Sequence, residues 1–170
     1  MPFDREMVEA RVALDLITSD EMPKLAWDAL ESGLDGPAIR RLAALVRPTW
    51  FQVEEVRANA IREMKLSTLT IGDAACRLAR RRAQEILQSG EDPLRCTRDL
   101  EQLWIKAQYP REMSILGTLD DEVSIARSMG SSEVDIRQWL IQRLRDSIAA
   151  TSMGSGPIST RPGNRSRADI

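Results

Sequence analysis

Apolar residues recur along most of the chain at the three- and four-residue spacing of an amphipathic helix. The scarcity of consecutive β-branched residues and the 4% aromatic content argue against a sheet. The clearest apolar stripe precedes Gly33 and consists of Met22, Leu25, Ala26, Ala29 and Leu30. Similar stripes predict helices over residues 4–17, about 18–33, 37–46, 49–65, 70–89, 92–109 and 132–149, with a short helix after Thr118.

Threonine followed three residues later by Glu, Gln or Asp marks several of the predicted helix starts. This is the spacing of a capping box, in which the hydroxyl accepts from a first-turn N–H and the later side chain reaches back to the cap residue. The pairs are Thr18/Glu21, Thr49/Gln52, Thr70/Asp73 and Thr118/Asp121. At the first helix we expect Asp4 to be the cap, with Phe3 and Val8 in contact across it.

The linkers between the predicted helices are roughly three to ten residues long, which is typical of consecutive antiparallel helices. The sequence therefore predicts a single all-α domain over residues 1–150, a bundle of seven or eight short antiparallel helices. The junctions around Gly33 and Gly90 resemble each other, so a short α-solenoid of helix pairs is the alternative. Residues 151–170 are rich in Gly, Ser, Pro and Arg, and we expect them to form a disordered tail.

Catalytic chemistry is poorly represented in the composition. The chain has no His, its two Cys are isolated, and no phosphate-binding or metal-ligand motif occurs. Bases and nucleophile pairs that use an imidazole are thereby excluded. Acid pairs such as Glu54/Glu55 lie in helical first turns, where the helix dipole stabilises them. We expect no cofactor and no enzymatic activity; an unfamiliar active site of carboxylates and arginines is the remaining enzymatic alternative.

The sequence also bears on location. The N-terminal MPFDREMVEA carries acids where a secretory signal would carry basic residues, and no stretch approaches the ~20 apolar residues of a membrane span. If Cys76 and Cys96 lie on a helix hairpin that turns near Gly90, they are offset along it by about 13 Å, too far for a disulfide. We therefore expect reduced thiols and a cytoplasmic protein without membrane contact.

Four arginines, Arg77, Arg80, Arg81 and Arg82, form the one basic cluster of the predicted helical region. At about 100° per residue we expect them to point in different directions around the helix. Arg82 shares the face of the apolar positions, so it is either in a structural ion pair, extended past the core, or exposed to a partner. The net charge of −2 disfavours a dedicated nucleic-acid binder. A nucleic-acid-associated regulator that uses Arg77, Arg80 and Arg81 with the basic tail is the alternative function.

Three aromatic residues lie off the apolar stripes of their own helices. Trp27 and Trp139 sit about 130° from the stripe centres, and Phe51 is similarly displaced. Each is either buried against a second neighbour or part of an exposed patch that binds another protein. The second possibility predicts a non-enzymatic protein-protein interaction module: an adaptor, regulator or immunity-type inhibitor. The candidate partner-binding residues are Trp27, Phe51, Arg82 and Trp139.

The stretch PKLAWDALESGLDGPAIRRLAAL, residues 23–45, resembles the N-terminal signature of a group of small, uncharacterised all-helical bacterial proteins. The shared pattern is Pro-x-Leu-Ala-x-x-Ala-Leu-x-x-Gly-x-Asp-x-Pro-Ala-x-Arg-x-Leu-Ala. The resemblance implies a helical protein of bacterial origin. It implies no activity and no site residues, since none is assigned to that group.

Overall fold

The computed structural model describes residues 3–152, and every regular element in that range is a helix, which confirms the all-α prediction. Helix α9 continues two residues into the predicted tail, and residues 153–170 lie outside the described part. The α-helices are α1 (Arg5–Ala13), α2 (Met22–Glu31), α3 (Pro37–Ala43), α4 (Trp50–Glu63), α5 (Ile71–Ser89), α6 (Thr97–Lys106), α7 (Ser114–Gly117), α8 (Leu119–Ser128) and α9 (Glu133–Ser152), with 3-10 helices η1 (Pro93–Arg95) and η2 (Arg111–Met113).

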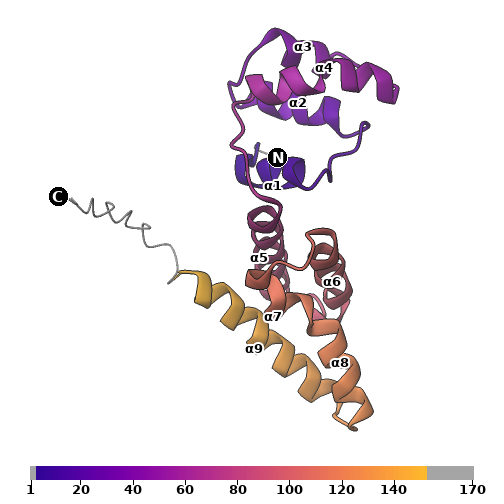
Figure 1. Ribbon diagram of the computed structural model, residues 1–170, viewed down its shortest axis with the longest axis vertical. Coiled ribbons are helices and arrows are strands. Elements are labelled where there is room, and N and C mark those ends of the chain that lie inside the picture. Colours follow the sequence, from indigo (N-terminus) through magenta and orange to yellow (C-terminus); the bar gives the residue numbers. More distant parts are fainter. Residues whose placement is uncertain (1–2, 153–170) are drawn as a thin grey trace, which may run out of the picture.

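The described part of the chain buries its apolar side chains in two clusters, and α1 contributes to both. Helices α2, α3 and α4 enclose the first cluster, and α5 to α9 enclose the second. Val8 of α1 belongs to the first, while Ala10 and Leu14 belong to the second. Figure 1 shows the result as an elongated molecule, with α2 to α4 at one end and α1 between them and α5.

The predicted caps are confirmed at three helices. Asp4 accepts from the Met7 N–H at the start of α1, and Phe3 packs on the same cluster as Val8. A complete capping box opens α4, because the Thr49 hydroxyl accepts from the Gln52 N–H and the Gln52 side chain accepts from the Thr49 N–H. Thr70 likewise accepts from the Asp73 N–H at α5.

The other two boxes were wrong as helix caps. The Thr18 N–H donates to the Glu21 carboxylate, but that contact lies before α2. The side chain of Glu21, the residue at the cap position of α2, makes no capping hydrogen bond to the helix. Thr118 does precede α8, but its hydroxyl accepts no backbone N–H of that helix. The hydroxyl lies instead 3.0 Å from the Ser114 carbonyl oxygen and 2.8 Å from the Glu122 carboxylate. The predicted helix over 92–109 is also divided, into η1 and α6.

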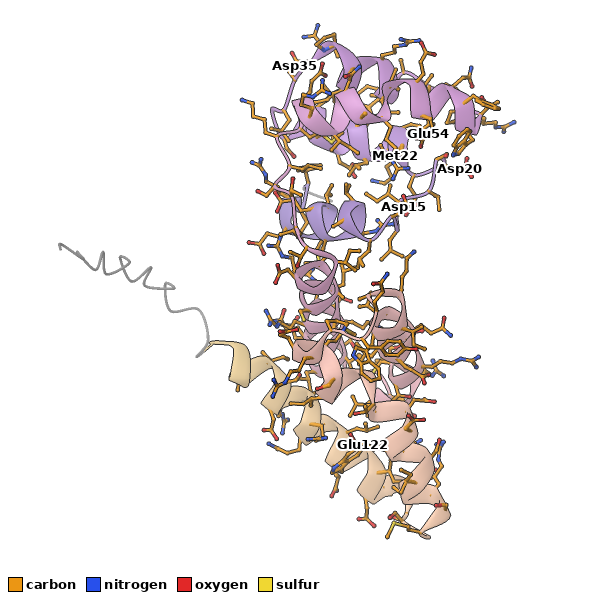
Figure 2. The ribbon with its side chains drawn as sticks, viewed as in Figure 1. Asp15, Asp20, Met22, Asp35, Glu54 and Glu122 are labelled. Carbon is orange, nitrogen blue, oxygen red and sulfur yellow. The ribbon has the colours of Figure 1, made fainter. Side chains whose placement is uncertain are left out.

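Helix α1 ends at Ala13, four residues before the predicted end. Asp15 then adopts a left-handed conformation with φ 49°, which turns the chain away from the helix axis. Arg57 of α4 fixes this turn, since it pairs with Asp15 at 2.7 Å and with Glu54 at 3.0 Å. Figure 2 labels both acids on the side where the α1–α2 loop approaches α4.

The first turn of α3 is capped by a residue from another helix. The Glu63 carboxylate, at the end of α4, accepts from the backbone N–H groups of Ala38 at 2.8 Å and Ile39 at 3.0 Å. A Cβ on Gly36 would lie 2.3 Å from the Glu63 Oε2 atom. Glycine at this position is therefore what admits the carboxylate.

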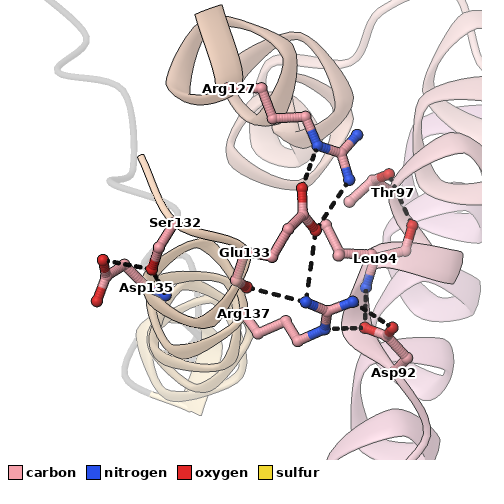
Figure 3. A network of polar contacts seen from close by, with 8 residues as sticks. All are labelled: Asp92, Leu94, Thr97, Arg127, Ser132, Glu133, Asp135 and Arg137. Carbon is pink, nitrogen blue, oxygen red and sulfur yellow. Dashed lines mark hydrogen bonds and ion pairs between the residues drawn. The ribbon is translucent and has the colours of Figure 1, made fainter. Parts of the chain in front are cut away.

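A chain of ion pairs holds α9 against the helices beside it. Arg137 of α9 binds both carboxylate oxygens of Asp92, at 3.1 and 3.0 Å, immediately before η1. Glu133, one turn earlier, pairs with Arg127 of α8 at 2.7 Å, and its carboxylate also approaches Arg137 (Figure 3). These bonds link α8, α9 and the turn after α5.

Candidate functional site

Three large apolar side chains protrude from the corner between α3 and α4. Val46, Trp50 and Phe51 are 86%, 60% and 78% exposed. The Trp50 and Phe51 rings meet edge to face, with centroids 5.0 Å apart and an interplanar angle of 75°. We call these three residues the aromatic corner.

The local structure explains why this corner is exposed. The capping box at Thr49 fixes the start of α4, and the buried stripe of Val53, Val56 and Ala60 faces the first cluster. Helix α3 ends at Ala43, and Val46 lies in the connection between it and Thr49. The aromatic rings are thus held on a fixed helical turn without being covered.

Trp27 lies on α2, in the same three-helix unit as the aromatic corner, and is 56% exposed. Of the two alternatives for Trp27, burial against a second neighbouring helix does not occur. Its neighbours Ala26 and Ala29 are fully buried. Trp27 is a second exposed aromatic position of the α2–α4 unit, alongside Phe51.

Arg82 and Trp139 lie in the other half of the molecule. Arg82 binds Glu91 through two hydrogen bonds of 3.0 and 3.1 Å, so its interpretation as a structural ion pair is confirmed. This bond to Glu91 raises the pKa of the Arg82 guanidinium. Trp139 packs on the second cluster, with the Arg143 guanidinium carbon 5.7 Å from its ring centroid. The four candidate partner-binding residues are therefore divided between the two halves.

Three of the four clustered arginines line one cleft beside α1 and α5, with a volume of about 610 Å³. The expectation that all four point apart was wrong for Arg77, Arg80 and Arg81, because spacings of three and four residues return to one helix face. Arg77 pairs with Glu9 at 3.1 Å and Arg81 with Glu85 at 2.9 Å. Four acids also line the cleft: Asp4, Glu6, Asp73 and Glu112.

Glu9 is the one buried acid of the described chain, with 6% exposure. Burial raises its pKa, but hydrogen bonds from the Ser67 N–H at 2.8 Å and from Arg77 at 3.1 Å outweigh burial, and the net pKa is lowered. The carboxylate therefore joins α1, the linker before α5, and α5 itself. Arg77 serves this structural contact and is not a free cation.

Both cysteines are free and buried, as predicted. Burial raises the pKa of Cys76, which lies at the cleft beside Arg80, and raises that of Cys96 to about 11. The Cys96 Sγ donates to the Pro93 carbonyl oxygen at 2.9 Å. Both groups are therefore protonated thiols at neutral pH and poor nucleophiles.

Within residues 3–152 no group of three or more acids or cysteines is arranged to hold a metal ion. None of the helices in this range has the length and apolarity that crossing a bilayer requires. Comparison of the chain with protein-family models, with curated protein sequences and with solved structures finds no match.

Proposed function

We propose that the chain is a non-enzymatic protein-binding module, in the class of adaptors, regulators and immunity-type inhibitors, and that the aromatic corner contacts its partner. The observation that carries the proposal is the pair Trp50 and Phe51, whose rings meet edge to face while 60% and 78% exposed. Contiguous exposed apolar groups mark interaction surfaces, and Trp is enriched among the residues that dominate binding energy.

The capped first turn of α4 supports the same proposal. A side chain on a fixed helical turn loses less conformational freedom on binding than one on a mobile loop, so more of its contact energy contributes to affinity. Thr49 and Gln52 provide this fixed turn. Trp27, on α2, is a further exposed aromatic side chain of the α2–α4 unit.

Binding of nucleic acid through Arg77, Arg80 and Arg81 is less well supported. Two of these cations are already paired with acids, and further acids line the same cleft. Affinity for a phosphate backbone depends on the number of cations free to neutralise it. We also place the protein in a bacterial cytoplasm, which the free buried thiols and the signature at residues 23–45 support.

The test is an affinity pull-down from a bacterial lysate, with nuclease, followed by binding measurements on the purified partner. We expect the wild-type chain to retain one stoichiometric partner and Trp50→Ala/Phe51→Ala to weaken its affinity by at least about tenfold. Ile125→Ala/Met129→Ala is the matched control, since these residues are 57% and 80% exposed on and after α8. Trp27→Ala tests whether α2 takes part.

Two outcomes would overturn the proposal. Unchanged affinity of the Trp50/Phe51 variant, with the circular dichroism of the wild type, would remove the aromatic corner as the binding surface. Recovery of nucleic acid alone, lost steeply as salt rises, would favour the arginine cleft instead.

A further inference from the structure

A second surface lies in the other half of the molecule, in the groove between α5 and α6. The groove has a volume of about 890 Å³. Its floor is apolar and includes Leu78 of α5, Leu103 and Ile105 of α6, and Leu16 from the loop after α1. Leu16, Leu78 and Leu103 also pack against the second cluster, so the floor is a continuation of that core at the surface.

The rim of this groove is basic. Arg98 and Lys106 line it, and Asp99 is the one acid among its lining residues. Arg82 also lines it, but its charge is already balanced by the ion pair with Glu91. Among the described residues Arg98 makes no ion pair, and the Lys106 ammonium contacts only the Asp15 carbonyl oxygen, at 3.5 Å. The chain as a whole has a net charge of −2, so this rim is a local reversal of its charge.

The length of the groove matches a short helical ligand. From Arg98 to Lys106 helix α6 advances about 12 Å, at ~1.5 Å per residue. The apolar anchors of an amphipathic helix at i, i+3 or i+4, and i+7 cover about 10 Å by the same rise. A groove with this floor and rim is complementary to a helix that has leucine-type anchors flanked by acids.

We propose that the α5–α6 groove binds an acidic amphipathic helix of a partner protein. The C-terminal segment 153–170 of this chain is not a suitable occupant, because it carries three arginines and one acid and would meet a rim of its own charge. The groove is in the opposite half of the molecule from the aromatic corner. The groove would give the module a second partner. The proposal for the groove does not depend on the proposal for the aromatic corner.

The test uses a fluorescein-labelled designed peptide of about 16 residues, with Leu at the anchor positions and Glu beside them. One control peptide has Lys in place of Glu, and the other has Ala in place of Leu. By fluorescence anisotropy with the full chain, we expect the Glu/Leu peptide to bind at least about tenfold more tightly than either control peptide. Its affinity should fall as the salt concentration rises.

Variants locate the binding. Arg98→Glu/Lys106→Glu should lower the affinity for the Glu/Leu peptide by at least about tenfold and raise the affinity for the Lys peptide. Arg111→Glu/Arg145→Glu is the matched control: it has the same net charge, and it reverses two exposed arginines that make no ion pair among the described residues. This control should keep the wild-type affinity.

Several results would overturn the proposal. The proposal is wrong if the Glu/Leu peptide does not bind, or if the Lys peptide binds as tightly as the Glu/Leu peptide. It is also wrong if the Arg98→Glu/Lys106→Glu variant binds the Glu/Leu peptide with the wild-type affinity. Self-association that this variant abolishes would show that a second copy occupies the groove, and displacement of bound peptide only by a fatty acid would show a lipid. If the charge-reversed variant fails to fold by circular dichroism, Arg98→Gln/Lys106→Gln and the two control peptides decide the question.

Discussion

Gly117, in the one-turn helix α7, is packed directly against a tryptophan. A Cβ added there would lie 2.3 Å from two ring atoms of Trp104 and 2.7 Å from the Trp104 Cβ. Because the Trp104 Cβ is the base of that side chain, rotation of the ring cannot relieve the contact. We therefore predict that Gly117→Ala destabilises the protein.

The structure sets the size of this effect. To reach ordinary contact the Trp104 ring must move by about 1 Å, which strains a well-packed site by about 1–3 kcal/mol. The movement also disturbs the hydrogen bond from Trp104 Nε1 to the Pro110 carbonyl oxygen, 3.1 Å long, at a cost of about 1 kcal/mol. The higher helix propensity of Ala offsets at most about 1 kcal/mol. These contributions combine to a net loss of about 1–4 kcal/mol.

Gly72 provides the matched control in α5. A Cβ there would lie 3.4 Å from the Pro110 Cβ and 4.0 Å from the Thr70 Oγ1 atom, and both are ordinary contacts. Gly72→Ala should therefore stabilise the protein by up to about 1 kcal/mol, since Ala is the better helix former and restricts the unfolded chain. Urea unfolding followed by circular dichroism measures both variants. If Gly117→Ala is as stable as the wild type, the close packing of Trp104 on this turn is refuted.

Two further substitutions test the contacts that join distant segments. The lowered pKa of Glu9 makes its contribution to stability fully present above the ordinary value of 4.5 and progressively lost as the pH falls through the lowered value. Glu9→Gln should thus cost about 2 kcal/mol in urea unfolding at pH 7, and the difference in unfolding free energy from the wild type should shrink as the pH falls below the ordinary value of 4.5. A difference that does not depend on pH would contradict this. Glu63→Ala should lose about 1–2 kcal/mol by thermal unfolding because α3 loses its cap, and an unchanged melting temperature would show that Ala38 and Ile39 do not need the carboxylate.

The helices were predictable because their signals are local. Asp4, Thr49 and Thr70 cap their helices as their spacing to the next turn predicts, and apolar stripes such as Met22, Ala26 and Ala29 are buried. The helical period states which face of a helix is buried but not which neighbour covers it. The division into two clusters, with α1 shared between them, depends on those neighbours and was not predicted.

The same limit applies to the candidate site. Of the two aromatic rings at the start of α4, the sequence singled out Phe51 and not Trp50, although both are exposed and in contact. Glu9 is buried because of partners 58 and 68 residues later in the chain. The joint position of Arg77, Arg80 and Arg81, in contrast, was available from their spacing alone.

The capping of α3 by Glu63 has a consequence for the order in which the protein matures during synthesis. Helix α3 has seven residues, far fewer than the roughly 12–15 at which an isolated helix is even marginally stable in water. Its cap lies 25 residues after Ala38, so the nascent chain cannot complete α3 until α4 has left the ribosome. Until then the apolar residues of α2 and α3 lack the partner surface that α4 provides in the first cluster, and exposed apolar surface of this kind makes a nascent chain prone to aggregate.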